Sequence, residues 1–443
     1  MSVSPSRQAA YRILLRVARG EEYAVTLLQA IEPGALSDAE RRLATEIVMG
    51  VLRWQGALDA EIARWSSRPV ARLDPEVAIA LRMGAYQILR LDRVPKSAAV
   101  NESVELTKMA RRSSASGLVN AVLRKIEKPA AGQPGLALRT TAQLLPHWLY
   151  QRWRSRFGNE AAEKLALASV ENPPVTLRPA QPGLGRDALQ NELALQAVIT
   201  QPCLYAPQAL RVIQGNPFVS AAWREGRAIA QDEASQLVAG LLMPMPGQRV
   251  LDLCAAPGIK ASQIALAMEN GRLVAADASS GRLEVMRKLI EGKIPAGVEL
   301  RILRHDAARQ PLPAIEQFDR ILVDAPCTGT GTLARNPEIK WRLAEGDITR
   351  MAQTQRAILS HALAALAPGG RLIYSTCSLE PEENEEVVRS ILAEQTGIRA
   401  AGAAEMLDDL PALGGLIDPE GFFRTRPDRD AMDGFFAAAL LRQ

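Results

Sequence analysis

Residues 250–260 read Val-Leu-Asp-Leu-Cys-Ala-Ala-Pro-Gly-Ile-Lys, and this stretch decides the fold of the second half of the chain. A short apolar run containing an acid is followed by a turn of small residues, and residues 261–268 then have the pattern of a helix. This order predicts the first strand, loop and crossover helix of a doubly wound, mostly parallel sheet. Since ligands lie at the carboxyl ends of the strands in such sheets, we expect a cofactor beside this loop. The loop matches neither G-x-G-x-x-G nor G-x-x-x-x-G-K-[ST], which disfavours dinucleotides and nucleoside triphosphates.

Four more apolar runs, separated by helix-length segments, continue the predicted sheet at residues 273–276, 300–303, 321–323 and 372–374. Polar residues follow these runs at Asp277, Asp306, Asp324 and residues 375–377. A carboxylate has two acceptor oxygens, so Asp277 after the second strand suits the two hydroxyls of a ribose. Asp306 is suited to accept a hydrogen bond from an exocyclic amine. Acids in this order predict a nucleoside-cofactor site in an α/β domain.

The chain has four cysteines, Cys203, Cys254, Cys327 and Cys377, and only three histidines. The cysteines are far apart and form no C-x-x-C pair, a pattern that predicts neither a disulfide framework nor a zinc site. We therefore expect reduced thiols in a cytoplasmic protein and no bound metal. Cys203 and Cys254 are interpreted as packing residues, as buried cysteines usually are.

Cys327 and Cys377 differ, because each follows a predicted strand and is expected to face the same cleft as the cofactor loop. C5 of cytosine is too weak a nucleophile to take a methyl group unaided, whereas addition of a thiolate at C6 makes C5 enamine-like. Asp324 is placed to hydrogen-bond or protonate N3 of such a base. Pro326-Cys327 and Thr376-Cys377 are both candidate nucleophiles, and the residues alone do not choose between them.

The first part of the chain predicts a helical bundle, because residues 5–127 have helical periodicity throughout. Ser37-Asp38-Ala39-Glu40 is a capping box that predicts a helix start. Asp74-Pro75 predicts another, with an N-cap followed by proline at the first helical position. A segment rich in Pro, Gly and Ala after residue 128 predicts a linker.

A small α+β subdomain that binds RNA is expected between the bundle and the sheet. A helix is predicted to begin at residues 146–149 and to end before Asn172-Pro173-Pro174, and strand-like runs follow at 174–177 and 209–213. Trp153 stands among arginines in this helix, which suits stacking and phosphate contact on single-stranded RNA. A half-buried Trp with exposed arginines is the plainer interpretation. The predicted organisation is a bundle, a linker, this subdomain and a catalytic domain, over residues 1–130, 131–145, 146–230 and 231–443.

Charge is distributed unevenly along the chain. Residues 1–130 hold 20 Lys and Arg against 14 Asp and Glu, and residues 131–230 hold 10 against 6, whereas residues 231–443 hold 23 against 29. A basic N-terminal part before an acidic C-terminal part suits a polyanion bound by the N-terminal part. A solvated basic surface explains so small an excess of Lys and Arg equally well. No run of 18 apolar residues and no secretory signal pattern is present, so we expect neither a membrane span nor export.

Two resemblances organise these observations. Residues 81–89, 94–102 and 117–124 resemble NusB-type domains, a family that binds RNA and partner proteins. The second half resembles the RNA cytosine-C5 methyltransferases of the NOL1/NOP2/Sun group, and with its NusB-like front the whole chain resembles the bacterial members that act on 16S ribosomal RNA. The resemblance is weakest over residues 130–230. The motifs that carry the second resemblance are residues 252–258, 324–331, 336–341, 374–385 and 433–436.

This second resemblance implies a Rossmann-like class I methyltransferase domain that uses S-adenosylmethionine. The residues implied to wrap the methionine part of the cofactor are Cys254, Ala255, Ala256, Pro257, Gly258, Ile259 and Lys260. Asp277 is implied to hold the ribose and Asp306 the adenine. The other implied roles are Asp324 near the methyl donor and the base, Cys377 as the nucleophile, and Cys327 in release of the product.

The implied activity is methylation of a 16S rRNA cytosine by a cytoplasmic protein, expected to be a monomer. The target base must leave its stack to reach Cys377, so an accessible or single-stranded site is expected. One alternative keeps the chemistry on transfer RNA or another ribosomal site. Another is a non-catalytic RNA-binding or assembly factor.

The sequence departs from the family pattern at two places. The family loop usually reads Gly-Gly-Lys-Thr where this chain has Gly258-Ile259-Lys260-Ala261. Loss of a glycine is expected to cost backbone freedom, and loss of the Thr removes a hydroxyl. Asp428 stands where the family usually has His. Both departures are expected to affect cofactor affinity or target fit.

Overall fold

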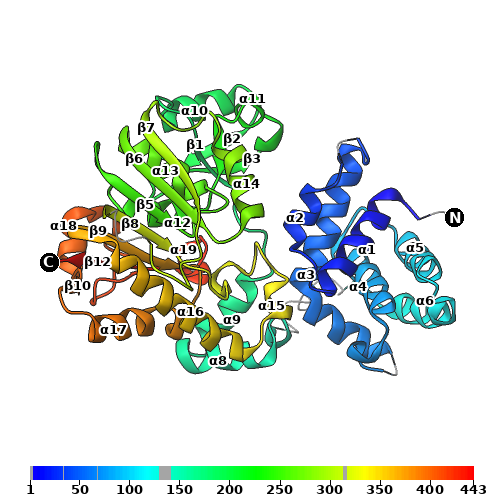
Figure 1. The fold of residues 1–443 in the computed structure, drawn as a ribbon. Helices are drawn as coiled ribbons and strands as arrows, with labels where there is room; N and C mark the ends of the chain where they lie inside the picture. The colour runs from blue at the N-terminus through cyan, green and yellow to red at the C-terminus, as the bar shows by residue number, and fades with distance from the viewer. Residues whose placement is uncertain (1–2, 33, 67, 129–140, 313–316) are drawn as a thin grey trace. The chain divides into compact units, whose positions relative to one another are not determined.

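The computed structural model describes residues 3–32, 34–66, 68–128, 141–312 and 317–443. It forms two compact units, each described here by itself (Figure 1). Unit 1 contains residues 1–172 together with 332–343, and unit 2 contains residues 173–331 and 344–443. The linker predicted at 131–145 falls largely on residues 129–140, outside the described part, so its limits stay a prediction.

Unit 1 is helical, as predicted for the front of the chain. The capping box is confirmed, because the Glu40 amide donates to Ser37 Oγ at 3.3 Å and the Ser37 amide donates to Glu40 Oε2 at 3.1 Å. Asp74 precedes α4 but makes no side-chain capping bond, and its carboxylate instead lies 3.6 Å from Arg112. The elements are α1 Pro5–Ala18, α2 Ala24–Gln29, α3 Asp38–Trp65, η1 Val70–Arg72, α4 Pro75–Arg90, α5 Lys96–Met109, η2 Ser113–Ala115, α6 Ser116–Lys125, η3 Thr141–Gln143, α8 His147–Phe157, α9 Asn159–Ala168 and α15 Ile339–Arg342.

The helix predicted to run from residue 146 to residue 172 is two helices. Gly158, at φ 84°, separates α8 from α9, because a helix cannot continue through a residue in that conformation. Trp153 is 1% exposed, so its ring is part of the interior and is not available for base stacking. The stacking interpretation of Trp153 is therefore wrong.

The segment 332–343 leaves the chain of unit 2 and completes the core of unit 1. Lys340 is 0% exposed, and its ammonium donates to the carbonyl oxygens of Arg53 at 2.8 Å and Ser169 at 3.4 Å. The Trp341 indole donates to the Leu52 carbonyl at 2.7 Å. The motif at 336–341, which looked like part of the catalytic half, therefore serves the helical unit.

Replacing Lys340 by Met is expected to destabilise the protein, and more so at high pH. Burial, with some repulsion from Arg53, lowers the pKa of Lys340 well below its ordinary value. The unfolded chain then binds more protons than the folded one, so Lys340 supports folding better as the pH rises towards about 10.4. Denaturant unfolding should show a cost on the order of 1–3 kcal/mol that is larger near pH 10 than near pH 7. A difference in unfolding free energy between wild type and Lys340→Met that becomes smaller at high pH would contradict this. Lys108→Met, at an exposed lysine, is the control.

Unit 2 begins with a small four-stranded antiparallel sheet in the order β2-β3-β1-β4. Two of its strands lie where the sequence predicted them, at 174–177 and 209–213, and its apolar core includes Leu177, Leu193 and Leu210. The elements are β1 Thr176–Pro179, α10 Arg186–Ala194, β2 Ile199–Pro202, β3 Leu210–Gln214, η4 Pro217–Val219, α11 Ala221–Arg224 and β4 Ala228–Ala230.

The larger sheet of unit 2 has the order β10-β12-β9-β8-β5-β6-β7, with β11 paired to β12. Strands β9, β8, β5, β6 and β7 are parallel, which confirms the predicted sheet, and β12 and β10 add an antiparallel edge. Alternate residues face opposite layers: Val250 packs with α12–α14, whereas Leu251 packs with α16 and α17. The strands are β5 Arg249–Leu253, β6 Asn270–Asp277, β7 Gly297–Arg304, β8 Phe318–Asp324, β9 Leu366–Thr376, β10 Ile398–Ala400, β11 Phe423–Arg424 and β12 Phe436–Arg442.

Helices cover both faces of this sheet (Figure 1). The five parallel strands contain every apolar run that the sequence assigned to the sheet, and they place the carboxyl ends of β5, β6, β8 and β9 along one edge. The remaining elements are α12 Glu233–Leu241, α13 Ile259–Met268, α14 Ser280–Ile290, η5 Thr330–Thr332, α16 Glu345–Ala364, η6 Pro381–Glu383, α17 Glu385–Glu394, α18 Ala403–Asp409, η7 Pro411–Leu413 and α19 Pro427–Asp430.

Candidate active site

The loop after β5 turns at Gly258, which has φ 96°. A Cβ atom there would lie 2.5 Å from Met286 Cγ on α14, so glycine is required both by conformation and by space. Ile259 is the first residue of α13 and has no positive φ. The expected loss of backbone freedom at Ile259 is therefore wrong, because the position is helical and needs no glycine.

Asp252, inside the apolar run of β5, was given no role from the sequence. Its side chain is 1% exposed, and neither carboxylate oxygen has a hydrogen-bond partner among the described residues. Burial, with repulsion from Asp324, raises the pKa of Asp252 to about 7. An acid within an otherwise apolar strand is the signal that could have singled it out, because such a group needs a partner. A buried carboxylate of this kind suits a cationic ligand.

Replacing Asp252 by Asn is expected to stabilise the protein without ligand at neutral and alkaline pH. An acid whose folded pKa is raised favours folding below its unfolded pKa, near 3.9, and loses that contribution as the pH rises through 7. At pH 8 the wild-type protein loses about 4 kcal/mol of stability by ionising Asp252, and the variant loses about 2 kcal/mol by burying the Asn amide. The variant should therefore be more stable by roughly 2 kcal/mol. Denaturant unfolding at pH 5 and pH 8 checks this. Equal stability of both proteins at pH 8 would contradict it, and Asp306→Asn, at a half-exposed acid, is the control.

The two acids assigned to a nucleoside lie at the ends of the neighbouring strands. Asp277 is the last residue of β6 and is buried, and it accepts from the Ser279 amide at 2.9 Å and the Ala256 amide at 3.3 Å. The exposed Arg282 lies 3.1 Å from the same carboxylate. Asp306, just beyond β7, is half-exposed and lies 3.2 Å from Arg309.

The structure brings the two cysteines of interest into contact. Cys327 follows β8, Cys377 follows β9, and their sulfurs are 3.4 Å apart. The hydrogen bond with Cys377 and burial raise the pKa of Cys327 well above its ordinary value. At neutral pH Cys327 is therefore protonated and can donate its hydrogen to the sulfur of Cys377.

A charged pair lies beside these thiols. Lys260 Nζ is 2.6 Å from Asp324 Oδ2, and the Ser375 hydroxyl donates to Asp324 Oδ1 at 2.9 Å. Burial lowers the pKa of Lys260, but the attraction of Asp324 and their hydrogen bond outweigh it and raise the pKa above its ordinary value. Cys377 contributes in the same direction, so an ammonium at Lys260 attracts a thiolate at Cys377. The pairing of Lys260 with Asp324 was not visible in the sequence, because 64 residues separate them.

The motif at residues 433–436 contacts the loop that follows Cys327. Gly331 donates to the Cys377 carbonyl at 2.9 Å, and Gly434 donates to the Gly331 carbonyl at 2.8 Å. A Cβ atom on Gly331 would lie 2.1 Å from the Gly434 carbonyl oxygen, so only glycine permits this approach. These two backbone hydrogen bonds connect residues 433–436, the loop after Cys327 and the loop that carries Cys377.

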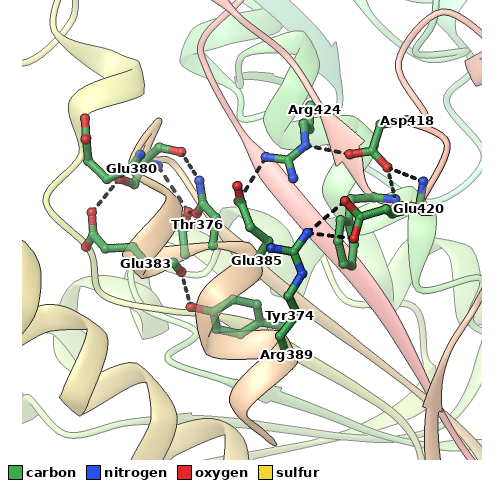
Figure 2. A network of polar contacts seen from close by, with 12 residues as sticks. Tyr374, Thr376, Glu380, Glu383, Glu385, Arg389, Asp418, Glu420 and Arg424 are labelled. Carbon is green, nitrogen blue, oxygen red and sulfur yellow. Dashed lines mark hydrogen bonds and ion pairs between the residues drawn. The ribbon is translucent and has the colours of Figure 1, made fainter. Parts of the chain in front are cut away.

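A network of polar contacts surrounds the strand end that carries Cys377 (Figure 2). The Tyr374 phenol donates to the Glu383 carbonyl at 2.5 Å, and Arg424 lies 3.1 Å from Glu385 and 2.7 Å from Asp418. These contacts tie η6 and the start of α17 to β9 and to the region around β11. The site edge of the sheet is thus held by buried and half-buried polar groups.

The other residues noted in the sequence lie at a distance from this chemistry or have partners. Cys203 packs in the apolar core, and burial raises the pKa of Cys254. Asp428 pairs with Arg426 at 2.7 Å, which gives the departure at this position a local partner. The described residues hold no cluster of His, Cys, Asp or Glu arranged for a metal ion. None of the helices within the described ranges combines the length and apolarity of a membrane crossing.

This strand order, with a glycine turn after β5 and acids after β6 and β8, defines a Rossmann-like methyltransferase domain. The chain belongs to the RsmB/F family, described as 16S rRNA methyltransferase RsmB/F, whose model matches residues 239–441. The NusB family model matches residues 4–128, and an RsmF/B-like ferredoxin-like domain matches residues 145–218. The chain therefore combines a NusB-like helical domain, a ferredoxin-like subdomain and a methyltransferase domain. The sequence predicted the first and the last, and predicted the second only as a small α+β subdomain.

Relatives match over the whole length. The "Probable ribosomal RNA small subunit methyltransferase B" of Bacillus subtilis is 30% identical over 100% of both chains. The "Ribosomal RNA small subunit methyltransferase B" of Pseudomonas putida is 33% identical over 98% of each. Among solved structures, that of PH0851 superposes with a TM-score of 0.79 at 27% identity and covers 99% of both chains.

Proposed function

We propose that this protein transfers a methyl group from S-adenosylmethionine to C5 of a cytosine in 16S ribosomal RNA, through a covalent bond between Cys377 and C6 of the base. The observation that carries the proposal is the 3.4 Å contact between the sulfurs of Cys377 and Cys327, beside the Lys260–Asp324 pair. Two thiols and an ion pair at the strand ends of a methyltransferase sheet fit addition to a pyrimidine better than direct transfer to a nitrogen or oxygen, which needs no thiol.

The site fits the proposed cofactor. The residues that would hold its methionine part are those of the loop 254–260, which ends at the N-terminus of α13, where helical amide groups have no partner within the helix and favour a carboxylate. The unpartnered carboxylate of Asp252 supplies negative charge for the cationic part. Asp277 and Asp306 would hold the ribose and the adenine. The bound cofactor supplies an activated methyl group.

The cysteines divide the reaction into two halves. In the first, the Cys377 thiolate forms a bond to C6, electron density moves towards C5, and C5 takes the methyl group. In the second, the proton at C5 passes to water, its electron pair restores the C5–C6 double bond, and the Cys377–C6 bond breaks to return the thiolate and release the methylated base. Cys327, in contact with Cys377, acts in this second half. The ammonium of Lys260 attracts the thiolate that adds to the base.

Asp324 is proposed to contact the N3 edge of the cytosine. It is held in place by Lys260 and by the Ser375 hydroxyl, so its carboxylate cannot rotate freely. Asp324 in its protonated form donates a hydrogen bond to N3, which neutralises the negative charge that develops on the ring when the thiolate adds. The cytosine must reach this edge unstacked, which agrees with a flipped-out or single-stranded target.

The RNA partner is proposed from three features. The relatives described above are named small-subunit rRNA methyltransferases, the front of the chain matches the NusB family, and residues 1–230 carry the excess of basic residues. Attraction between basic side chains and the phosphate groups supports RNA binding that does not depend on the base sequence. Contacts in the catalytic pocket select the base.

Transfer of a tritiated methyl group to RNA tests the proposal. Small-subunit rRNA from cells that lack this protein should accept about one methyl group per molecule, and mapping should place it on C5 of one cytosine. The same RNA from cells that contain the protein is the control and should accept almost none. Label at a base nitrogen or a ribose oxygen, or label confined to transfer RNA, would refute the proposed reaction or substrate.

A further inference from the structure

Glu383, at the end of η6, is a buried acid for which the reaction above has no role. It is 0% exposed, and its side chain accepts four hydrogen bonds. Oε1 accepts from the Thr328 amide at 2.8 Å and from Gln355 Nε2 at 3.0 Å. Oε2 accepts from the hydroxyls of Thr328 and Ser378. All four donors are neutral groups, so Glu383 is held by hydrogen bonds alone in these contacts.

Three of the four donors belong to the two loops that carry the cysteines. Thr328 directly follows Cys327, and Ser378 directly follows Cys377. Gln355 on α16 also donates to the Pro326 carbonyl at 2.9 Å, immediately before Cys327. One carboxylate thus binds the residue after each sulfur.

The backbone of Glu383 is also held in place by a hydrogen bond. The Tyr374 phenol on β9 donates to the Glu383 carbonyl at 2.5 Å (Figure 2). Burial raises the pKa of Glu383, whereas its hydrogen bonds with Ser378, Thr328 and Gln355 lower it. Burying a carboxyl group costs free energy even when both of its oxygens accept hydrogen bonds. A role in the site therefore accounts for Glu383 better than packing does.

We propose that Glu383 is a positioning residue that keeps the sulfurs of Cys327 and Cys377 in contact by bridging Thr328 and Ser378. It positions the sulfurs through these two neighbours, and its charge also helps to raise the pKa of Cys327. Its importance for catalysis rests on the function proposed above, but the positioning itself does not. Since a displacement of about 1 Å in a catalytic group can cost about a hundredfold in rate, loosening the bridge should slow the reaction strongly.

The distance between the thiols can be followed without RNA or cofactor. A diazene oxidant such as diamide takes one hydrogen from each thiol, and its N=N bond is reduced to a hydrazine while the two sulfurs join as a disulfide. The sulfurs must close from 3.4 Å to about 2.05 Å, so the rate reports how well they are held together. Mass spectrometry of the peptides that contain residues 327 and 377 measures this rate in the full-length protein.

Glu383→Ala is expected to slow disulfide formation about tenfold or more and to lower kcat at least as much, with the KM values for cofactor and RNA within about twofold of wild type. Glu383→Gln keeps an acceptor for the Thr328 amide and should recover part of both rates. The matched control is Glu385→Gln, which removes the charge that faces Arg424, and it should form the disulfide at the wild-type rate.

Wild-type rates of disulfide formation in folded Glu383→Ala would overturn the proposal. If that variant does not fold, Thr328→Val and Ser378→Ala each remove one hydroxyl from the bridge and should slow the disulfide several-fold. Wild-type rates in both would overturn it equally. Because the measurement needs no methyl transfer, a slowed disulfide in a protein that methylates no RNA would refute the proposed function and leave the bridge standing.

Discussion

Cys377→Ala is expected to reduce methyl transfer to RNA by at least about a thousandfold, equivalent to roughly 4 kcal/mol of transition-state stabilisation. Without this sulfur no bond to C6 forms, and C5 stays too weak a nucleophile. The fold should be little affected, because the Cys377 side chain is only partly buried and its carbonyl still accepts from Gly331. Single-turnover transfer of a tritiated methyl group measures the loss.

Cys203→Ala is the matched control for this variant. Cys203 is also a free cysteine, but it follows β2 of the small antiparallel sheet and not a strand of the parallel sheet, so its loss should leave the transfer rate near wild type. Full activity in Cys377→Ala would end the assignment of the nucleophile. Binding of cofactor to Cys377→Ala at wild-type affinity would show that the loss lies in the chemical step.

Cys327→Ala is expected to accumulate a covalent protein–RNA adduct. The Cys377 thiolate can still add to C6, but the second half of the reaction lacks its thiol, so the bond between protein and base persists. Denaturing electrophoresis should show a species of lower mobility that disappears after nuclease treatment, and multiple turnover should fall at least about a hundredfold.

The double variant, Cys327→Ala with Cys377→Ala, should form no adduct. An adduct in Cys377→Ala together with none in Cys327→Ala would reverse the two roles. This outcome is a real alternative, because Pro326-Cys327 and Thr376-Cys377 are equally acceptable nucleophiles by their sequence. The hydrogen bond with Cys377 and burial raise the pKa of Cys327 well above its ordinary value.

The parallel sheet could be predicted because its information is local. Each buried strand is a short apolar run, and the acid at or just beyond its end marks the carboxyl edge, so the sequence alone places Asp277 and Asp324 at that edge. The antiparallel edge was missed, because the alanine-rich run of β12 at 436–442 carries little strand signal of its own.

Contacts between distant segments could not be predicted. The pairing of Lys260 with Asp324 joins the first turn of α13 to the end of β8, and Glu383 receives donors from Thr328 and Gln355, which belong to other elements. No periodicity marks such pairs, because each residue alone is an ordinary polar side chain. The buried acid Asp252 is the exception, since its apolar neighbours make it conspicuous.

The insertion of residues 332–343 into unit 1 bears on how the chain is made. The Ala24 amide donates to Glu338 across 314 residues, and Lys340 fills the space beside Arg53 and Ser169. During translation the N-terminal helices emerge first, yet their last packing partner leaves the ribosome only after roughly three quarters of the protein has been synthesised. The front is therefore not an exchangeable module: a graft of residues 1–172 onto another enzyme carries an unfinished interior unless the distant insert travels with it.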